Sequence, residues 1–477
     1  MKSKLYHAAT TADSYTENGA VTHSTTGHSV LDFFFNAPVS RNKSDKDLVA
    51  AYAKAYNEDR DLALRALLWS RDILKGAGER RLFRTCLLWL IDKHIDDAYL
   101  VMGRSMEDGI GRWDDIFVAM NTEAEEYALQ LFVNALLNKD RLAAKWAPRK
   151  GEIAHKLRSY MQLSPKDYRR LVVGLSNTVE QQMCANLWDE IEYSHVPSVA
   201  HSRYRKAFGR HSKERYVAYL NRVKDPNSSE KINAKAIFPH DVIRPSMLMG
   251  YGPGMSSLEI QAAETQWYAL PDYVDGDESI LPVIDVSGSM TSRVGPTTLV
   301  NCLDVAVTLG LYVSERLKSA FKDHFVTFST TPKLQYVTGS VVDRMQTICR
   351  SKWDMSTNLI GVFELILQTA KKHRLSQEDL PTKVLILSDM EFDSAVRGGT
   401  NFDTIDKMYQ AAGFTRPQLV FWNIQSRSDS NFPVKQGTAG TALISGFSPA
   451  ILSSVMSGEL EPLKVVAKTL RSPRYDY

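Results

Sequence analysis

The sequence predicts an α + α/β fold, in which an all-α region of helical repeats precedes a doubly wound, mostly parallel sheet. From Asp45 to about Arg141, apolar residues recur three and four positions apart, which is the period of amphipathic helices. From about Asp277 onward, short apolar runs alternate with longer helical segments. That alternation is typical of parallel strands joined by helices. The chain has 477 residues, enough for about two to four domains.

The order of these patterns defines four segments. The first segment is polar and ends in an aromatic cluster at 31–35, which we expect to hold it against the rest of the protein. The glycine-containing turn at 75–79 separates two helices of the second segment. The expected segments are an N-terminal arm at 1–44, a helical-repeat region at 45–257, a connecting helix and linker at 258–276, and a sheet domain with C-terminal helices at 277–477.

Positive charge is concentrated in the middle of the first half. Residues 140–224 contain 17 Lys and Arg against 8 Asp and Glu, although the whole chain carries a net charge of only +3. Tyr204, Phe208, Tyr216 and Tyr219 are interleaved with this charge, and they could stack on bases or belong to a helix core. The candidate RNA-binding residues are Arg203, Arg205, Lys206, Arg210, Lys213 and Arg215. Residues that could add to the patch or only solvate helix ends are Arg71, Lys75, Arg80, Arg81 and Arg84.

The cysteines and the apolar runs of the chain indicate its cellular location. The four cysteines lie far apart and form no CxxC pair, so we expect reduced thiols and a cytoplasmic protein. The N-terminal residues are polar and do not resemble a signal peptide. No apolar run approaches the roughly 18 residues that cross a membrane, and no membrane partner is expected.

The most informative stretch is Leu281–Met290. Its first residues form an almost unbroken apolar run, as expected of a strand buried on both faces of a parallel sheet. The run ends in Asp285, with Ser287 and Ser289 at the following alternate positions and Gly288 between them. Alternate strand residues share a face, so three hard oxygen donors should converge at the carboxyl end of a central strand. Such donors suit Mg²⁺ or Mn²⁺ better than zinc.

Two later residues would complete a metal site. Thr357 lies in a loop just before a helix, and Asp389 ends a second fully apolar strand. Each could instead be a helix N-cap. N-caps would explain each residue singly, but not the joint order of strand, DxSxS, loop threonine and second strand aspartate. The roles of Glu391 and Asp393, which follow in the same loop, stay open.

This order resembles the metal-ion-dependent adhesion site of von Willebrand factor A (vWA) domains. All five ligand positions are matched, by Asp285, Ser287, Ser289, Thr357 and Asp389. The resemblance implies that the hydroxyls contact the ion, that the aspartates act largely through water, and that one position stays open for a partner's carboxylate. Many vWA domains have Gly after the second aspartate, where this chain has Met390.

A wider resemblance covers nearly the whole chain. Several stretches look like an uncharacterised family of bacterial, viral, plant and fungal proteins with a helical region before a vWA domain. The layout is similar to the Ro autoantigen, in which HEAT-like TROVE helical repeats form a ring closed by a vWA domain and bind RNA. The sequence does not decide whether the helices here form a ring. The stretches are 16–35, 71–83, GRWDD at 111–115, 144–148, 188–208, SDMEFD at 388–393 and 419–423.

These observations favour a non-enzymatic protein. The chain contains no HExxH, GxxxxGK[ST] or GxSxG motif, and we expect His195 and His240 to be structural. The leading hypothesis is a Ro-like ribonucleoprotein component that binds structured or single-stranded RNA and carries an Mg²⁺ (or Mn²⁺) site in its vWA domain. The alternative is a vWA module for metal-dependent protein–protein interaction without an RNA role. A metal-dependent hydrolase is a minor third reading, with Glu391 as its only candidate base.

Overall fold

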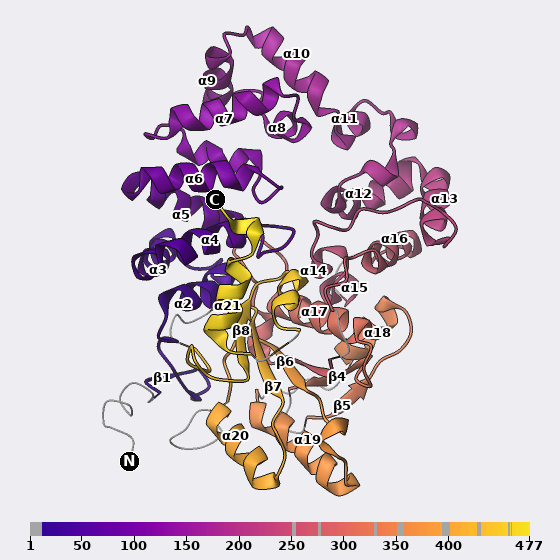
Figure 1. Ribbon diagram of the computed structural model, residues 1–477. Helices are drawn as coiled ribbons and strands as arrows, with labels where there is room; N and C mark the ends of the chain where they lie inside the picture. Colours follow the sequence, from indigo (N-terminus) through magenta and orange to yellow (C-terminus); the bar gives the residue numbers. More distant parts are fainter. Residues whose placement is uncertain are drawn as a thin grey trace. The chain divides into compact units, whose positions relative to one another are not determined.

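The computed structural model divides the chain into two compact units, each built from distant parts of the sequence (Figure 1). The sheet unit comprises Met1–Leu62 and Phe238–Leu470, and the helical unit comprises Ala63–Ile237 and Arg471–Tyr477. The sheet unit is thus larger than the domain that the sequence predicts from residue 277. It also takes in the N-terminal arm, residues 45–62 and 238–257 of the predicted helical-repeat region, and the predicted connecting segment 258–276. The structure describes residues 12–249, 254–274, 278–328, 332–350, 357–393, 401–426, 431–456, 458 and 460–477.

The helical unit is built mainly of α-helices, as the periodicity predicts, with longer connections at 107–124 and 185–197 that contain 3-10 helices. The predicted break at 75–79 is confirmed, since no residue between Arg71 and Arg80 is helical. A Cβ on Gly76 would lie 1.9 Å from the backbone oxygen of Trp69, so only glycine fits this turn. The helices are α4 (Arg60–Arg71), α5 (Arg80–Lys93), α6 (Ile95–Met106), α7 (Glu125–Leu137), α8 (Arg141–Trp146), α9 (Glu152–Tyr160), α10 (Pro165–Ser176), α11 (Val179–Cys184), α12 (Ser198–His211) and α13 (Lys213–Lys224).

Local sequence signals fix several helix ends in this unit. Ser164 is the N-cap of α10, its hydroxyl accepting the N–H of Asp167 at 3.1 Å, and Pro165 follows at the first helical position. The non-helical residues 147–151 separate α8 from α9. In the parts of the chain that the structure describes, no helix is both long enough and apolar enough to span a membrane.

The C-terminal heptapeptide completes the core of the helical unit. The Arg474 guanidinium binds the carboxylate of Asp72, which is fully buried. The Tyr475 hydroxyl donates to the same carboxylate at 3.1 Å. Arg104 donates to the backbone oxygen of Arg474 at 2.6 Å, and Arg65 pairs with Asp476 at the same distance. Without this peptide, the Asp72 charge would lose the cation that neutralises it.

Replacing Arg474 with Ala should destabilise the helical unit by about 3 kcal/mol or more, because it leaves a buried carboxylate without its cation. Chemical denaturation followed by circular dichroism measures this loss. Arg471→Ala, an exposed arginine three residues earlier, is the matched control and should change stability little. Equal effects of the two substitutions would contradict this account of the tail.

The described part of the sheet unit contains a six-stranded sheet in the order β5-β4-β3-β6-β7-β8. All pairs are parallel except the edge pair of β4 and β5. Numbered within the sheet, this is the 3-2-1-4-5-6 order of doubly wound α/β folds, so a helical region followed by a mostly parallel α/β sheet is confirmed. The strands are β3 (Ile280–Ile284), β4 (His324–Thr327), β5 (Leu334–Tyr336), β6 (Lys383–Ser388), β7 (Gln418–Asn423) and β8 (Thr441–Ser445).

The two central strands, β3 and β6, are buried along their whole length. Helix α17 (Cys302–Arg316) packs on both of them, and its residues from Cys302 to Ser314 are all buried. A Cβ on Gly310 of this helix would lie 2.5 Å from Ile284 Cδ1, so glycine allows the close approach. The other helices of the unit are α3 (Asp45–Glu58), α14 (Pro239–Val242), α15 (Pro245–Met249), α16 (Ser257–Tyr268), α18 (Val341–Arg350), α19 (Leu359–His373), α20 (Asn401–Ala412) and α21 (Pro462–Leu470).

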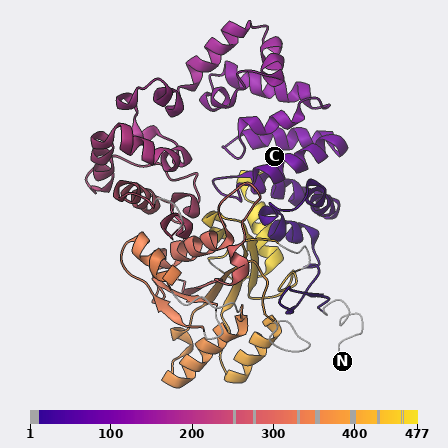
Figure 2. The ribbon, with the colours of Figure 1, turned by 180° about the vertical axis from the view of Figure 1, so that it is seen from behind.

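The N-terminal arm packs on the sheet unit, as its aromatic cluster predicts. A short antiparallel hairpin of β1 (Ser14–Tyr15) and β2 (Val21–Thr22) leads into α2 (Ser29–Asn36). Helix α2, at the indigo end of the chain, lies beside β8 (Figure 2). It buries Phe33–Phe35 completely or nearly so. The Ser445 hydroxyl donates to the backbone oxygen of Phe34 at 2.8 Å. The arm is therefore part of the core of this unit.

Candidate functional site

The candidate site lies between β3 and β6, where the order of the strands in the sheet reverses. After β3 the chain continues to β4 on one side, and after β6 it continues to β7 on the other. Doubly wound sheets bind ligands at this switch point, beyond the carboxyl ends of the strands. Asp285 directly follows β3 and Asp389 directly follows β6, and these strands are paired in parallel from Ile280–Lys383 to Ile284–Leu387. The pairing therefore brings the two carboxylates to one edge, as the sequence predicts.

Asp285 is held in place by backbone and hydroxyl groups. Its backbone N–H donates to Leu387 O at 3.0 Å, which extends the strand pairing by one residue. Its carboxylate accepts the N–H of Ser287 at 2.9 Å and the hydroxyl of Ser388 at 2.5 Å. Both Asp285 and Ser388 are fully buried. Sequence reasoning missed Ser388, although its place as the last residue of an apolar strand beside Asp389 was an available signal.

The electrostatics of the pair favour a bound cation. Burial, together with the nearby charge of Asp389, raises the pKa of Asp285 to about 7. Asp389 is itself only 2% exposed. Two neighbouring carboxylates in a water-poor place cannot both stay ionised at low cost unless a proton or a positive ion is shared between them.

The two serines lie on the loop beyond β3. The sequence predicts them on alternate strand positions, but the strand ends at Ile284, and Ser289 lies in a short 3-10 turn, Gly288–Thr291. That expectation of strand geometry is therefore wrong, because the strand ends before Asp285 and the chain enters the 3-10 turn at Gly288. The serines nevertheless converge, since Ser287 Oγ and Ser289 Oγ are 2.9 Å apart. Ser287 is buried and Ser289 is half-exposed, so the cluster opens at Ser289.

Thr357 is fixed by the loop that follows β6. Its N–H donates to Asp393 Oδ2 at 2.8 Å, and Asp393 N donates back to Thr357 O at 3.3 Å. Thr357 is 1% exposed. It is not the cap of α19, because Asn358 takes that role by accepting the N–H of Gly361 at 2.9 Å. The rest of the predicted loop, 351–356, lies outside the described residues.

The other residues of the loop after β6 have structural roles. Glu391 is buried, and its two carboxylate oxygens accept the N–H of Glu17 at 2.6 Å and the amide of Asn431 at 2.8 Å. Burial raises the pKa of Glu391, with Asp389 adding to the effect. Met390 has φ 66°, in the left-handed region that glycine adopts readily. Glycine would adopt this backbone conformation without strain, whereas Met390 adopts it with strain.

The side chains that follow β3 and β6 offer oxygen donors, which fit Mg²⁺ or Mn²⁺. Among the described residues, no group of three or more His, Cys, Asp or Glu could hold a metal ion. The predicted set of ligands is different in kind, since it combines two carboxylates with three hydroxyls. Its members are Asp285, Ser287, Ser289, Thr357 and Asp389. The structure joins Ser287 to Asp285 and to Ser289, and it joins Thr357 to Asp393.

The predicted RNA-binding residues divide into two groups in the helical unit. Arg205 is buried, and Arg215 lies on Tyr193 and 3.6 Å from Glu192, so neither offers a free charge. Of the interleaved aromatics, Phe208, Tyr216 and Tyr219 are buried, so they form core and cannot stack on bases. The residues that remain on the surface are Arg203, Lys206, Arg210 and Lys213.

The arginines near the glycine turn do not form one basic patch. Arg71 and Arg84 both bind the buried carboxylate of Asp115, at 2.6 and 2.8 Å. Their charge is therefore used inside the helical unit. The neighbouring residues Arg80 and Arg81 are exposed.

Both units contain residues that match known protein families. Residues 279–469 match a domain of unknown function, DUF7788, and residues 16–99 and 133–277 match another, DUF2828. The chain is 26% identical over 517 residues to the Uncharacterized protein L728 of Acanthamoeba polyphaga mimivirus. That alignment covers 96% of this chain and 87% of the viral protein. The first match contains the whole candidate metal cluster, and the second contains the basic helices α12 and α13.

Asp285→Asn should stabilise the metal-free protein at pH 8 by about 1 kcal/mol or more, because it removes one of two adjacent buried charges. The pKa of the Asp285 carboxyl is 3.8 in the unfolded chain and about 7 in the folded protein. The protonated carboxyl therefore stabilises the fold fully below pH 3.8, and this stabilisation is lost as the pH rises through about 7. The advantage of the variant should therefore vanish as pH falls from 8 toward 4. Thermal unfolding in EDTA measures this difference.

Glu364→Gln, which removes an exposed charge on α19, is the matched control and should show no such pH dependence. A variant that is less stable than the parent protein at pH 8, or equally shifted at both pH values, would contradict the electrostatic argument.

Proposed function

We propose that the sheet unit is a vWA-type binding domain that holds Mg²⁺, or Mn²⁺, through Asp285, Ser287, Ser289, Thr357 and Asp389. The observation that carries the proposal is the pair of buried carboxylates beside two touching serine hydroxyls at the switch point. The 3-2-1-4-5-6 strand order and the chain order of the five residues agree with it. The ion would supply a Lewis-acidic position that binds a partner's carboxylate or another anionic oxygen.

In this proposal the protein is a binding protein and not an enzyme. Asp285 and Asp389 are committed to the cation, and Glu391 uses both oxygens to fix two loops. A cytoplasmic location, inferred from the dispersed cysteines, belongs to the same proposal.

Mg²⁺ should stabilise the protein through this cluster, because a ligand that binds only the folded state shifts unfolding by mass action. At 100 times the dissociation constant, the gain is about 2.7 kcal/mol. Titration calorimetry and thermal unfolding measure the affinity and the shift. Asp389→Ala should abolish both, whereas Glu378→Ala, at an exposed position, should leave them unchanged. A wild-type protein that does not respond to either Mg²⁺ or Mn²⁺ would overturn the proposal.

A second candidate function, RNA binding, is supported by the surface of α12. Arg203, Lys206 and Arg210 recur at helical spacing, and Lys213 begins α13; all four are exposed. Such a row can follow a phosphate backbone, and released counterions provide the affinity. Beside it, Trp188 and His211 stack with ring centroids 4.2 Å apart. This RNA could be structured or single-stranded, and either kind would contact the helical unit and not the metal.

Reversing the charges of Arg203, Lys206 and Arg210 to Glu should weaken RNA binding and flatten its salt dependence. Three lost phosphate contacts reduce the slope of log K against log[salt] by about 2 for single strands. Filter binding across a salt series, with structured and single-stranded RNA, measures the slope. The control reverses Lys371, Lys372 and Lys468, which are exposed on the sheet unit. A protein partner would be favoured if both variants lost RNA affinity equally, or if the wild-type protein bound RNA no more tightly than it bound an acidic protein.

A further inference from the structure

A cluster of arginines surrounds two neighbouring aspartates in the helical unit. Asp115 is fully buried, and its carboxylate accepts Nε of Arg71 at 2.6 Å and Nε of Arg84 at 2.8 Å. The carboxylate of Asp114 accepts both Nε and Nη2 of Arg112, and it lies 2.9 Å from Nη2 of Arg84. Three arginines therefore share two carboxylates, which leaves the cluster with an excess of positive charge.

Arg80 adds a charge to this cluster that is paired with no carboxylate. It precedes Arg84 by one turn of α5, so the two side chains share a face of the helix. Within the part of the chain that the structure describes, Arg80 forms neither a hydrogen bond nor an ion pair. Burial lowers the pKa of its guanidinium, and the charges of Arg112 and Arg71 lower it further against the opposing effect of the two aspartates. The side chain is nevertheless exposed, so the excess charge reaches the surface here.

Arg112 and Lys145 extend the positive region to Trp146, the last residue of α8. The Arg112 guanidinium lies over the Trp146 ring, with Cζ 3.6 Å from the ring centroid. This stacking fixes the plane of the guanidinium, whose Nη1 group donates to no atom of the described residues. The Lys145 ammonium lies 5.8 Å from the same centroid. Asp140, which precedes this helix, is committed to its N-cap. The region thus offers oriented donors that the protein itself does not use.

We propose that Arg80 and Arg112 bind a doubly charged phosphate group, either inorganic phosphate or that of a phosphate monoester. Guanidinium groups suit this ligand, because their planar forks donate pairs of hydrogen bonds to phosphate oxygens. The bound dianion would offset the repulsion among the arginines that the two aspartates leave uncompensated. A phosphodiester carries one charge and would offset less of it. This site depends neither on the proposed metal ion nor on the basic row of α12.

Calorimetric titration of the full chain with small phosphates tests for this site. At pH 8, inorganic phosphate and phenyl phosphate should each bind with a dissociation constant of about 1 mM, as expected of a few charge-assisted hydrogen bonds. Dimethyl phosphate, a diester, should bind about fivefold more weakly or worse. Binding of only one dianion would support the inference and identify the free ion or the monoester as the source. Absence of binding by both dianions, or equal binding of the diester, would overturn it.

Arg80→Gln tests where the anion binds. Because Arg80 is exposed and forms no ion pair, its replacement should leave the protein folded. The variant should bind the dianions about tenfold more weakly or worse, since it removes a charged pair of donors. The matched control, Arg81→Gln, removes the same charge about 100° further around α5 and should change the affinity less than about twofold. Equal losses in the two variants would reveal only general electrostatic attraction, and this result, like unchanged binding by Arg80→Gln, would overturn the inference.

Discussion

The parallel pairing of β3 with β6 is the constraint on which the candidate site depends. It sets the register that brings Asp285 beside Ser388 and Asp389, and it buries these groups at the end of two fully buried strands. Burial and the second charge together raise the pKa of Asp285. Polar groups this deep in a sheet destabilise a protein unless something compensates them. A divalent ion shared by the two carboxylates is the compensation that the oxygen-rich surroundings favour, and the adjacent serines offer its remaining ligands.

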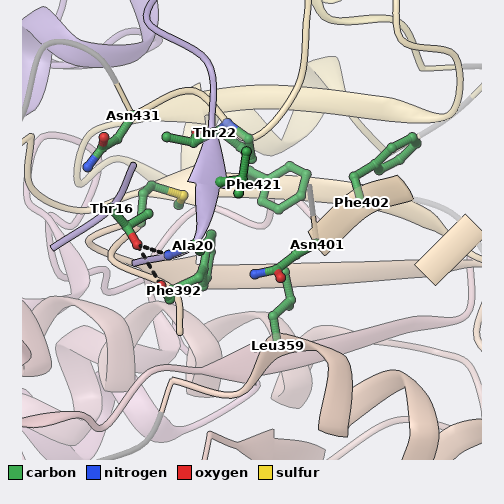
Figure 3. A pocket seen from close by; sticks show the side chains of 12 residues that line it. Thr16, Ala20, Thr22, Leu359, Phe392, Asn401, Phe402, Phe421 and Asn431 are labelled. Atoms are coloured by element: carbon green, nitrogen blue, oxygen red, sulfur yellow. Dashed lines mark hydrogen bonds between the residues drawn. The ribbon is translucent and has the colours of Figure 1, made fainter. Parts of the chain in front are cut away.

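Next to this pair of carboxylates, segments that are far apart in the sequence fix the loop that follows β6 (Figure 3). Glu391 is bound by the N-terminal hairpin on one side and by Asn431 on the other. Asp393 holds Thr357, and Met390 accepts a left-handed backbone so that the loop can turn. The hairpin, the loop and the start of α19 therefore form one assembly at the carboxyl edge of the sheet. A rigid edge of this kind suits recognition, in which a partner is bound and released without chemical change.

The central strands and most residues of the candidate site could be predicted from the sequence, because their signals are local. Apolar runs ending in Asp285 and Asp389 predicted two neighbouring central strands, and the DxSxS spacing predicted converging hydroxyls. The contacts of Asn18 and Glu391 could not be predicted, since they join segments whose pairing depends on the folded sheet. The buried states of Arg205 and Phe208 were also not readable, because helical spacing alone does not say which face meets a neighbour. The same limit explains why the C-terminal tail, with its hold on Asp72, carried no sequence signal.

The central claim is that one divalent ion binds between the ends of β3 and β6. Anomalous diffraction from a crystal of the full chain grown with Mn²⁺ tests it most directly. We predict a single strong manganese peak within about 2.0–2.6 Å of the Ser287 and Ser289 hydroxyls, a range set by ordinary metal–oxygen distances. A peak elsewhere, or none at this edge with manganese in millimolar excess, would contradict the account.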